Sequence, residues 1–284
     1  MWASLGLYVN SSSVISASPE TALIGLAVFG RYDQRLFDEA LSLISSHPTL
    51  FRPCYIKYWR SFLSAGAEKC LCLILKIAGI SDRGSQENSI LPDTMCSPLF
   101  LDDNGEPIFQ GEQFDPFFQE CGFTRNKFIP SKISPQLDVI ARANTWVRLR
   151  LTIGLNANAD IMLILLHKST LSAPILSALL GISTKSAWLI LQDFMAAGWV
   201  TKKTIGRKDR YTVTEEFQRA FSYFKHKKMK WSPLDWILAG YTLEDIIPPG
   251  ASVNYKKFSA QQRDKKMAHV LKLKDQMQVD GQSL

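Results

Sequence analysis

The sequence predicts a mainly α-helical fold that includes one small β-hairpin, and three observations support this fold class. Apolar residues recur at helical spacing in the first eighty residues and again between 159 and 197. Helix start and stop signals, such as Ser18-Pro19-Glu20 and Gly30, bracket these runs. Two β-rich stretches flank a glycine-containing turn between 199 and 213. A chain of 284 residues, 46% of them hydrophobic, is long enough for about two domains with buried cores.

Residues 1–80 are expected to form a helical N-terminal domain. Ser18 can cap its first helix, with a proline and an acid in the first turn. Four helices are expected near residues 21–29, 33–47, 55–63 and 68–77. No residue pattern in this domain indicates a particular chemistry.

Residues 81–137 are expected to form an irregular, acidic connector that contains aromatic residues. Its part from 81 to 121 has nine acidic residues and one basic residue, a net charge of −8. Frequent Pro, Gly, Asp and Asn with poor periodicity are typical of irregular structure. Its phenylalanines argue against a free linker, and we expect them to pin the segment across the protein surface. They include Phe100, Phe109, Phe114, Phe117, Phe118 and Phe123.

Residues 138–224 are expected to form a second domain that includes three short helices. These helices are expected at residues 159–167, 173–180 and 184–197. Their N-caps are expected to be Asn158, Ser172 and Ser183. The first of the three is apolar on every side, so the N-terminal domain or a second subunit has to cover its outer face.

The second and third of these helices are joined by the tight turn Gly181-Ile182-Ser183, where glycine can adopt a positive φ. One face of the third helix is continuously apolar and is expected to pack inward. It consists of Ala187, Ile190, Leu191, Phe194 and Met195. The hairpin follows at 199–213, with Gly206 in its turn.

This order of a helix, a helix-turn-helix and a hairpin resembles the winged helix-turn-helix of MarR-type and ArsR-type transcriptional regulators. Residues 171–183 look like their second helix and turn. Residues 194–200 look like the exit into their wing, and 206–214 look like the wing tip and returning strand. The resemblance lies between about Asn156 and Phe224, roughly a quarter of the chain. It implies a DNA-binding transcriptional regulator that acts as a homodimer on a two-fold site.

In such regulators the third helix enters the major groove of double-stranded DNA, and the wing lies on phosphates. The residues that the resemblance places near base edges are Thr184, Lys185, Ser186 and Gln192. The cations that it places near phosphates are Lys202, Lys203, Arg207, Lys208 and Arg210. The charge pattern agrees with this role, because residues 199–230 contain ten basic and three acidic residues. Their net charge of +7 equals that of the whole chain.

Three residues of the third helix depart from the pattern of a DNA-reading helix. Trp188 and Leu189 occupy positions that are normally polar, and Asp193 would be repelled by a nearby phosphate. The alternative function is therefore a protein–protein interaction module that uses the winged-helix scaffold without DNA binding. Its partner would dock on Trp188 and Leu189. An enzyme with an unfamiliar site in residues 1–137 is a third hypothesis.

Other patterns bear on chemistry and location. The chain lacks H-E-x-x-H, G-x-x-x-x-G-K-[ST] and G-x-S-x-G, so we expect no enzyme activity, no cofactor and no metal site. Five cysteines with scattered spacing are typical of buried thiols in a reducing compartment. The start of the chain lacks a basic region followed by a long apolar run, so a cytoplasmic location without membrane contact is expected. Residues 225–284 are expected to form a basic C-terminal segment.

Overall fold

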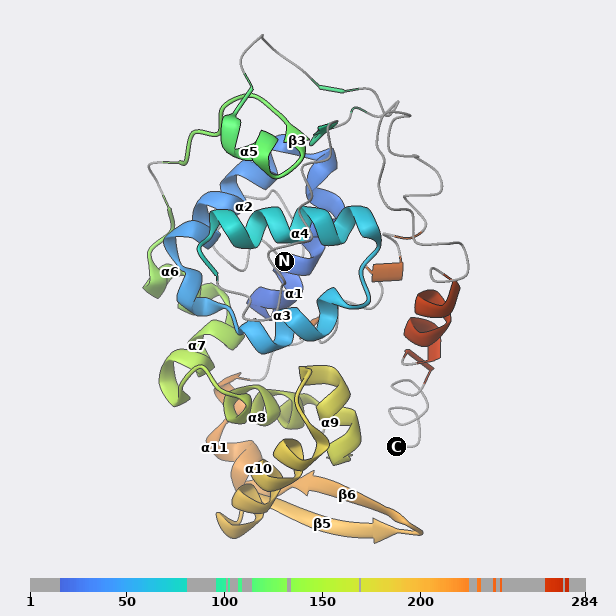
Figure 1. The fold of residues 1–284 in the computed structure, drawn as a ribbon. Helices are drawn as coiled ribbons and strands as arrows, with labels where there is room; N and C mark the ends of the chain where they lie inside the picture. The colour runs from blue at the N-terminus through green and yellow to red at the C-terminus, as the bar shows by residue number, and fades with distance from the viewer. Residues whose placement is uncertain are drawn as a thin grey trace.

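The computed structural model describes residues 16–80, 96–100, 102, 107–108, 114–131, 134–168, 170–224, 229–230, 237–238, 241, 264–272 and 274–275. Helices dominate these residues, and their largest sheet is antiparallel with three strands. The predicted mainly α-helical fold with a small sheet is therefore confirmed. Figure 1 shows the first helices of the chain in the half of the molecule away from the hairpin.

A bundle of four helices forms the N-terminal part. These are α1 (Pro19–Phe29), α2 (Gln34–Ser46), α3 (Pro53–Arg60) and α4 (Ala65–Ile77). The side chains of Ser18, Asp33 and Ser64 cap α1, α2 and α4 by accepting hydrogen bonds from backbone N–H groups. All four expected helices are present, but α3 and α4 begin earlier than predicted because Pro53 and Ser64 supply their starts. α1 is buried from Pro19 to Val28 and forms the centre of the bundle.

The segment from 96 to 131 packs against this bundle where the structure describes it. Its elements are β2 (Ser97–Pro98), α5 (Pro116–Glu120) and β3 (Phe123–Thr124), and β2 pairs in parallel with β3. Of the phenylalanines expected to pin it, Phe100, Phe118 and Phe123 are buried, whereas Phe114 is exposed and Phe109 lies outside the described residues. Arg125 forms a bidentate ion pair with Asp38 of α2, at 2.6 and 2.9 Å. Aromatic packing and this ion pair therefore hold the segment on the bundle.

Three further helices lead away from the bundle. They are α6 (Leu137–Ala143), α7 (Thr145–Ile153) and α8 (Ala157–His167). α8 is buried from Ala159 to Leu166, and α7 covers part of it, as its apolar sequence requires. The expected cap Asn158 is wrong, because Asn156 has the extended backbone of an N-cap. The Oδ1 atom of Asn156 accepts from the backbone N–H groups of Asn158 and Ala159, so Asn158 is already helical.

Four buried charged residues join the bundle to α7 and α8. Arg150 of α7 donates from Nε to Asp160 of α8 at 2.9 Å and from Nη1 to Glu20 of α1 at 2.8 Å. The guanidinium of Arg52 also contacts Asp160, and the Arg52 backbone N–H donates to Glu20 at 2.6 Å. No member of this ion cluster is more than 5% exposed. Burial by itself lowers the pKa of Arg150, but the carboxylates of Asp160 and Glu20 raise it above its ordinary value, so Arg150 remains charged.

Described parts of the C-terminal segment also pack on the bundle. β1 (Ser16–Ala17) pairs in parallel with β7 (Met229–Lys230). The Tyr241 hydroxyl donates to the carbonyl oxygen of Phe62 at 3.0 Å, and the ring of His269 stacks on Phe62 at 5.4 Å. Among all the residues that the structure describes, no single helix is long and apolar enough to cross a membrane.

Candidate nucleic-acid interface

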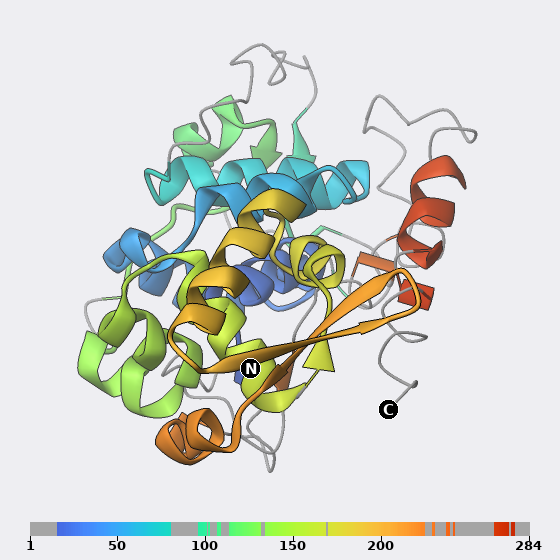
Figure 2. The ribbon, with the colours of Figure 1, turned by 90° about the horizontal axis from the view of Figure 1, so that it is seen from below.

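The end of the molecule opposite α5 and β3 is built from six elements (Figure 1). They are β4 (Thr170–Leu171), α9 (Ala173–Leu180), α10 (Thr184–Ala196), β5 (Val200–Ile205), β6 (Lys208–Val213) and α11 (Glu215–Ala220). The sheet has the order β4-β6-β5 and is antiparallel, with Val200 opposite Val213 and Ile205 opposite Lys208. The predicted hairpin is therefore present. In Figure 2 the hairpin and α10 face the viewer.

A three-residue turn redirects the chain between α9 and α10. Gly181 adopts the left-handed conformation, with φ of 61°, and the two helix axes differ in direction by 118°. Ser183 caps α10 as predicted, because its Oγ accepts from the Ser186 N–H at 3.0 Å. Ser172 stands at the N-cap position of α9, but its side chain makes no capping hydrogen bond. A Cβ atom at Gly181 would lie only 2.5 Å from Cβ of Tyr58 in α3, so this turn is seated directly on the bundle.

The two faces of α10 differ as the sequence predicts. Ala187, Leu191 and Phe194 are buried, and the other two residues of the apolar face are half-buried. Lys185, Leu189 and Gln192 follow the opposite face at spacings of four and three residues. Lys185 and Leu189 are exposed and Gln192 is half-buried.

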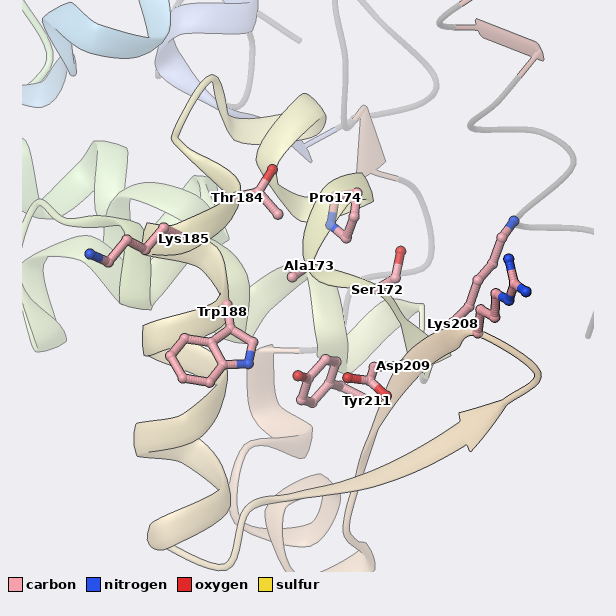
Figure 3. Close-up of a pocket in the computed structure, with 10 residues that line it drawn as sticks. Ser172, Ala173, Pro174, Thr184, Lys185, Trp188, Lys208, Asp209 and Tyr211 are labelled. Carbon is pink, nitrogen blue, oxygen red and sulfur yellow. The ribbon is translucent and has the colours of Figure 1, made fainter.

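The residues expected near base edges do not all have free polar groups. Thr184, Lys185 and Ser186 are exposed at the start of α10. However, the Thr184 hydroxyl donates to Oγ of Ser177 at 3.4 Å, and the hydroxyls of Ser183 and Ser186 share a hydrogen bond of 2.7 Å. In Figure 3 the Lys185 side chain extends away from the hairpin. The Nε2 atom of Gln192 contacts Sδ of Met195 at 3.9 Å.

The five cations expected on the hairpin lie on two faces and at its tip. Cross-strand partners share a face of a sheet, so Lys203, its partner Arg210 and Lys208 project from one face. Lys202 projects from the other face, together with Asp209 and Tyr211. Arg207 lies in the turn between β5 and β6. The structure therefore divides the expected set, because side chains alternate along each strand.

Lys202 is already engaged with an acidic side chain. Its Nζ lies 2.7 Å from Oδ2 of Asp209, and Oδ1 of Asp209 accepts from the Thr204 hydroxyl at 2.8 Å. The hydrogen bond to Asp209 raises the pKa of Lys202. The hydrogen bonds from Lys202 and Thr204 lower the pKa of Asp209. Because this carboxylate offsets the charge of Lys202, we expect Lys202 to attract a phosphate less than the exposed Lys203 and Arg207 do.

A groove of about 570 Å³ lies between the start of α9, α10 and the distal part of the hairpin (Figure 3). Four of the expected contact residues line it together: Thr184, Lys185, Arg207 and Lys208. The other five are not part of its lining: Ser186, Gln192, Lys202, Lys203 and Arg210. Trp188 and Tyr211 also line the groove. No local sequence signal points to Tyr211, because its position opposite α10 depends on the strand register.

The exposed apolar residues of α10 have different surroundings. Trp188 is 43% exposed and lines the groove, whereas Leu189 is 47% exposed and is not part of its lining. Among the residues with described placement, no group of three or more His, Cys, Asp or Glu residues is arranged to hold a metal ion. Comparison of the chain with protein-family models, curated proteins and solved structures finds no match. What this surface can bind therefore follows from its own geometry and charge.

Proposed function

We propose that residues 156–224 form a winged helix-turn-helix that docks on double-stranded DNA, and that the protein regulates transcription. The observation that carries this proposal is the 118° angle between α9 and α10 across a three-residue turn that contains Gly181. DNA-binding helix-turn-helix motifs have helices at about 90–120° joined by such turns. The hairpin directly after α10 supports the assignment of a wing.

The role that we propose for each element follows from the side chains that it exposes. α10 would enter the major groove, which is about 12 Å wide and admits one helix. Lys185 and Gln192, on its outer face, would contact base edges. Lys203, Arg207 and Lys208 are exposed and would neutralise phosphates, which gives affinity without sequence preference.

A homodimer on a two-fold site is part of the proposal. A single helix in the major groove contacts only a few base pairs, and two copies about one helical turn apart read a longer site. Sedimentation of the protein with and without a palindromic duplex tests this part. A complex that contains one protein chain per duplex at saturation would contradict it.

The DNA-binding proposal is tested by fluorescence anisotropy of labelled duplexes across a salt series. We expect affinity to fall steeply with salt. Lys203→Ala and Arg207→Ala should weaken binding to all duplexes alike, and each should reduce the slope of log K against log salt by about 0.9. Lys127→Ala is the matched control, because Lys127 is exposed near α5 and β3, at the far end of the molecule. Absence of binding at low salt would refute the proposal.

A change at the outer face of α10 should alter sequence choice instead. We expect Lys185→Ala to shift the preferred sequence in a selection from random duplexes, because the lost contact is with bases. A uniform loss of affinity, with the same preferred sequence as the wild type, would mean that Lys185 contacts phosphate.

The exposure of Trp188 and Leu189 favours a second candidate, a protein-binding surface on α10. Large side chains this exposed on neighbouring positions are typical of interaction sites when they form part of a larger patch. In that case Leu189→Ala would weaken partner binding and Lys203→Ala would not. The two candidates therefore predict opposite rankings of these two variants.

A further inference from the structure

Among the residues that the structure describes, none is a hydrogen-bond partner for the buried hydroxyl group of Tyr211. Tyr211 lies on β6 opposite Leu171 and Lys202, and the residue is 1% exposed. Buried polar groups in native proteins are nearly always hydrogen-bonded, so this hydroxyl is a candidate donor to a group that binds in the groove. Tyr211 lines the groove, and Figure 3 shows its hydroxyl end turned toward Trp188.

Trp188 gives the groove a flat aromatic surface. In Figure 3 its indole ring lies across α10 with the nitrogen edge turned toward Tyr211, and Trp188 is partly open to solvent. The buried face of α10 packs elsewhere, through Ala187, Leu191 and Phe194, so Trp188 is not needed for the core. An exposed indole beside a hollow is well placed to stack on a planar ring.

The charge of the groove favours an anion. Arg207 and Lys208 line it from the hairpin. Lys185 also belongs to the lining, but its side chain extends away from the hairpin (Figure 3), so its ammonium group is not directed at the groove. Asp209 is an acidic member of the lining, but its two carboxylate oxygens are engaged by Lys202 and Thr204. This carboxylate is therefore already engaged within the hairpin and does not offset the charge of Arg207.

We propose that the groove binds a nucleotide. The base stacks on Trp188 and accepts a hydrogen bond from the Tyr211 hydroxyl, and the phosphate lies against Arg207 in the turn of the hairpin. The groove volume of about 570 Å³ is within the range of about 300–1,000 Å³ for small-ligand pockets. The nucleotide is either free in solution or an unpaired residue of a single strand. This site does not depend on the docking of duplex DNA, but a free nucleotide would compete with duplex for Arg207.

Calorimetric titration of the full-length protein tests the site. The probes are AMP and dTMP, with adenosine as the probe that lacks phosphate, ribose 5-phosphate as the probe that lacks a base, and oligothymidylate as the single strand. We expect a monophosphate to bind more tightly than either adenosine or ribose 5-phosphate. Trp188→Ala should weaken binding by at least about fivefold through loss of stacking. Leu189→Ala is the matched control, because Leu189 is the next residue of α10 and is not part of the groove lining.

Tyr211→Phe separates a ligand-binding role from a structural one. This change keeps the ring and removes only the unpaired hydroxyl, so we expect an equal or higher melting temperature together with roughly fivefold weaker nucleotide binding. A lower melting temperature with unchanged nucleotide binding would mean that the hydroxyl has a structural partner, and it would overturn the proposal.

The outcomes also identify the source of the nucleotide. Binding of AMP or dTMP that is sensitive to Trp188→Ala supports a free nucleotide. Binding of oligothymidylate alone, with the same sensitivity, supports a single strand. If no probe binds, or if binding is insensitive to Trp188→Ala, the proposal is overturned. Binding of a blunt duplex by the same samples is measured in parallel, so failure of this site is distinguished from failure of the proposed function.

Discussion

Asp160→Asn should destabilise the whole protein by removing one charge from the ion cluster that joins the bundle to α8. Asparagine has nearly the same size, so little packing changes. However, Arg52 and Arg150 would then face a single carboxylate, that of Glu20, and one positive charge would be left unbalanced. Removal of one partner from a buried ion pair typically costs about 3–5 kcal/mol. For a chain of this size the melting temperature should fall by roughly 10 °C.

Urea unfolding, followed by tryptophan fluorescence and by far-ultraviolet circular dichroism, measures the effect. Asp138→Asn is the matched control, because Asp138 pairs with Arg142 on the surface and these side chains are 53% and 78% exposed. Asp138→Asn should lower the free energy of unfolding by less than about 0.5 kcal/mol. Adding Arg52→Met to Asp160→Asn restores the charge balance and should recover part of the loss. If the free energies of unfolding of Asp160→Asn and Asp138→Asn differ by less than about 1 kcal/mol, the ion cluster does not hold α8 to the bundle as the geometry indicates.

Two further predictions concern the turn before α10 and the buried hydroxyl of Tyr55. Gly181→Ala and Gly206→Ala both place a side chain at positive φ, which costs about 1–2 kcal/mol. Only the new methyl group of Gly181→Ala also meets Tyr58, so this variant should lose more free energy of unfolding in urea than Gly206→Ala does. Equal losses would contradict the close contact with Tyr58. Burial raises the pKa of Tyr55 to about 12. Because the folded pKa exceeds the unfolded value near 10, stability from Tyr55 is complete below pH 10 and is lost as the pH rises toward 12, at up to about 1.4 kcal/mol per pH unit. In Tyr55→Phe the urea midpoint of unfolding should fall less as the pH rises above 10. If it falls as steeply as in the wild type, ionisation of Tyr55 is not the cause of the loss of stability.

Local signals in the sequence are sufficient to predict α10 and the hairpin. The cap Ser183 and the apolar spacing of α10 act within a few residues of the chain, so they can be recognised without tertiary information. The same holds for the hairpin, where Gly206 supplies the positive φ of the turn. Alternation along β5 separates Lys202 from Lys203 without further information. The ion pair between Lys202 and Asp209, and the position of Tyr211 beside α10, depend on the strand register and on packing.

The ion cluster shows what local signals cannot supply. Glu20 and Asp160 each lie in the first turn of a helix, where an acid is favourable without any partner. Their actual partner Arg150 is 130 residues from Glu20 in sequence and lies in α7, a helix that is not among those predicted from the sequence. No periodicity links positions this far apart, so only the packed structure shows why these charges can be buried.

The position of the ion cluster also connects the bundle to the proposed interface. Asp160 lies in the first turn of α8, and α8 packs against both α9 and α10. The turn at Gly181 rests on Tyr58, which gives α10 a second contact with the bundle. Variants at the hairpin and at the Gly181 turn should therefore lose DNA affinity for different reasons. Lys203→Ala removes a charge at the hairpin and should act through salt-dependent affinity. Gly181→Ala changes none of the residues expected to contact DNA. If the folded variant nevertheless loses DNA affinity, the contact with the bundle sets the orientation of α10.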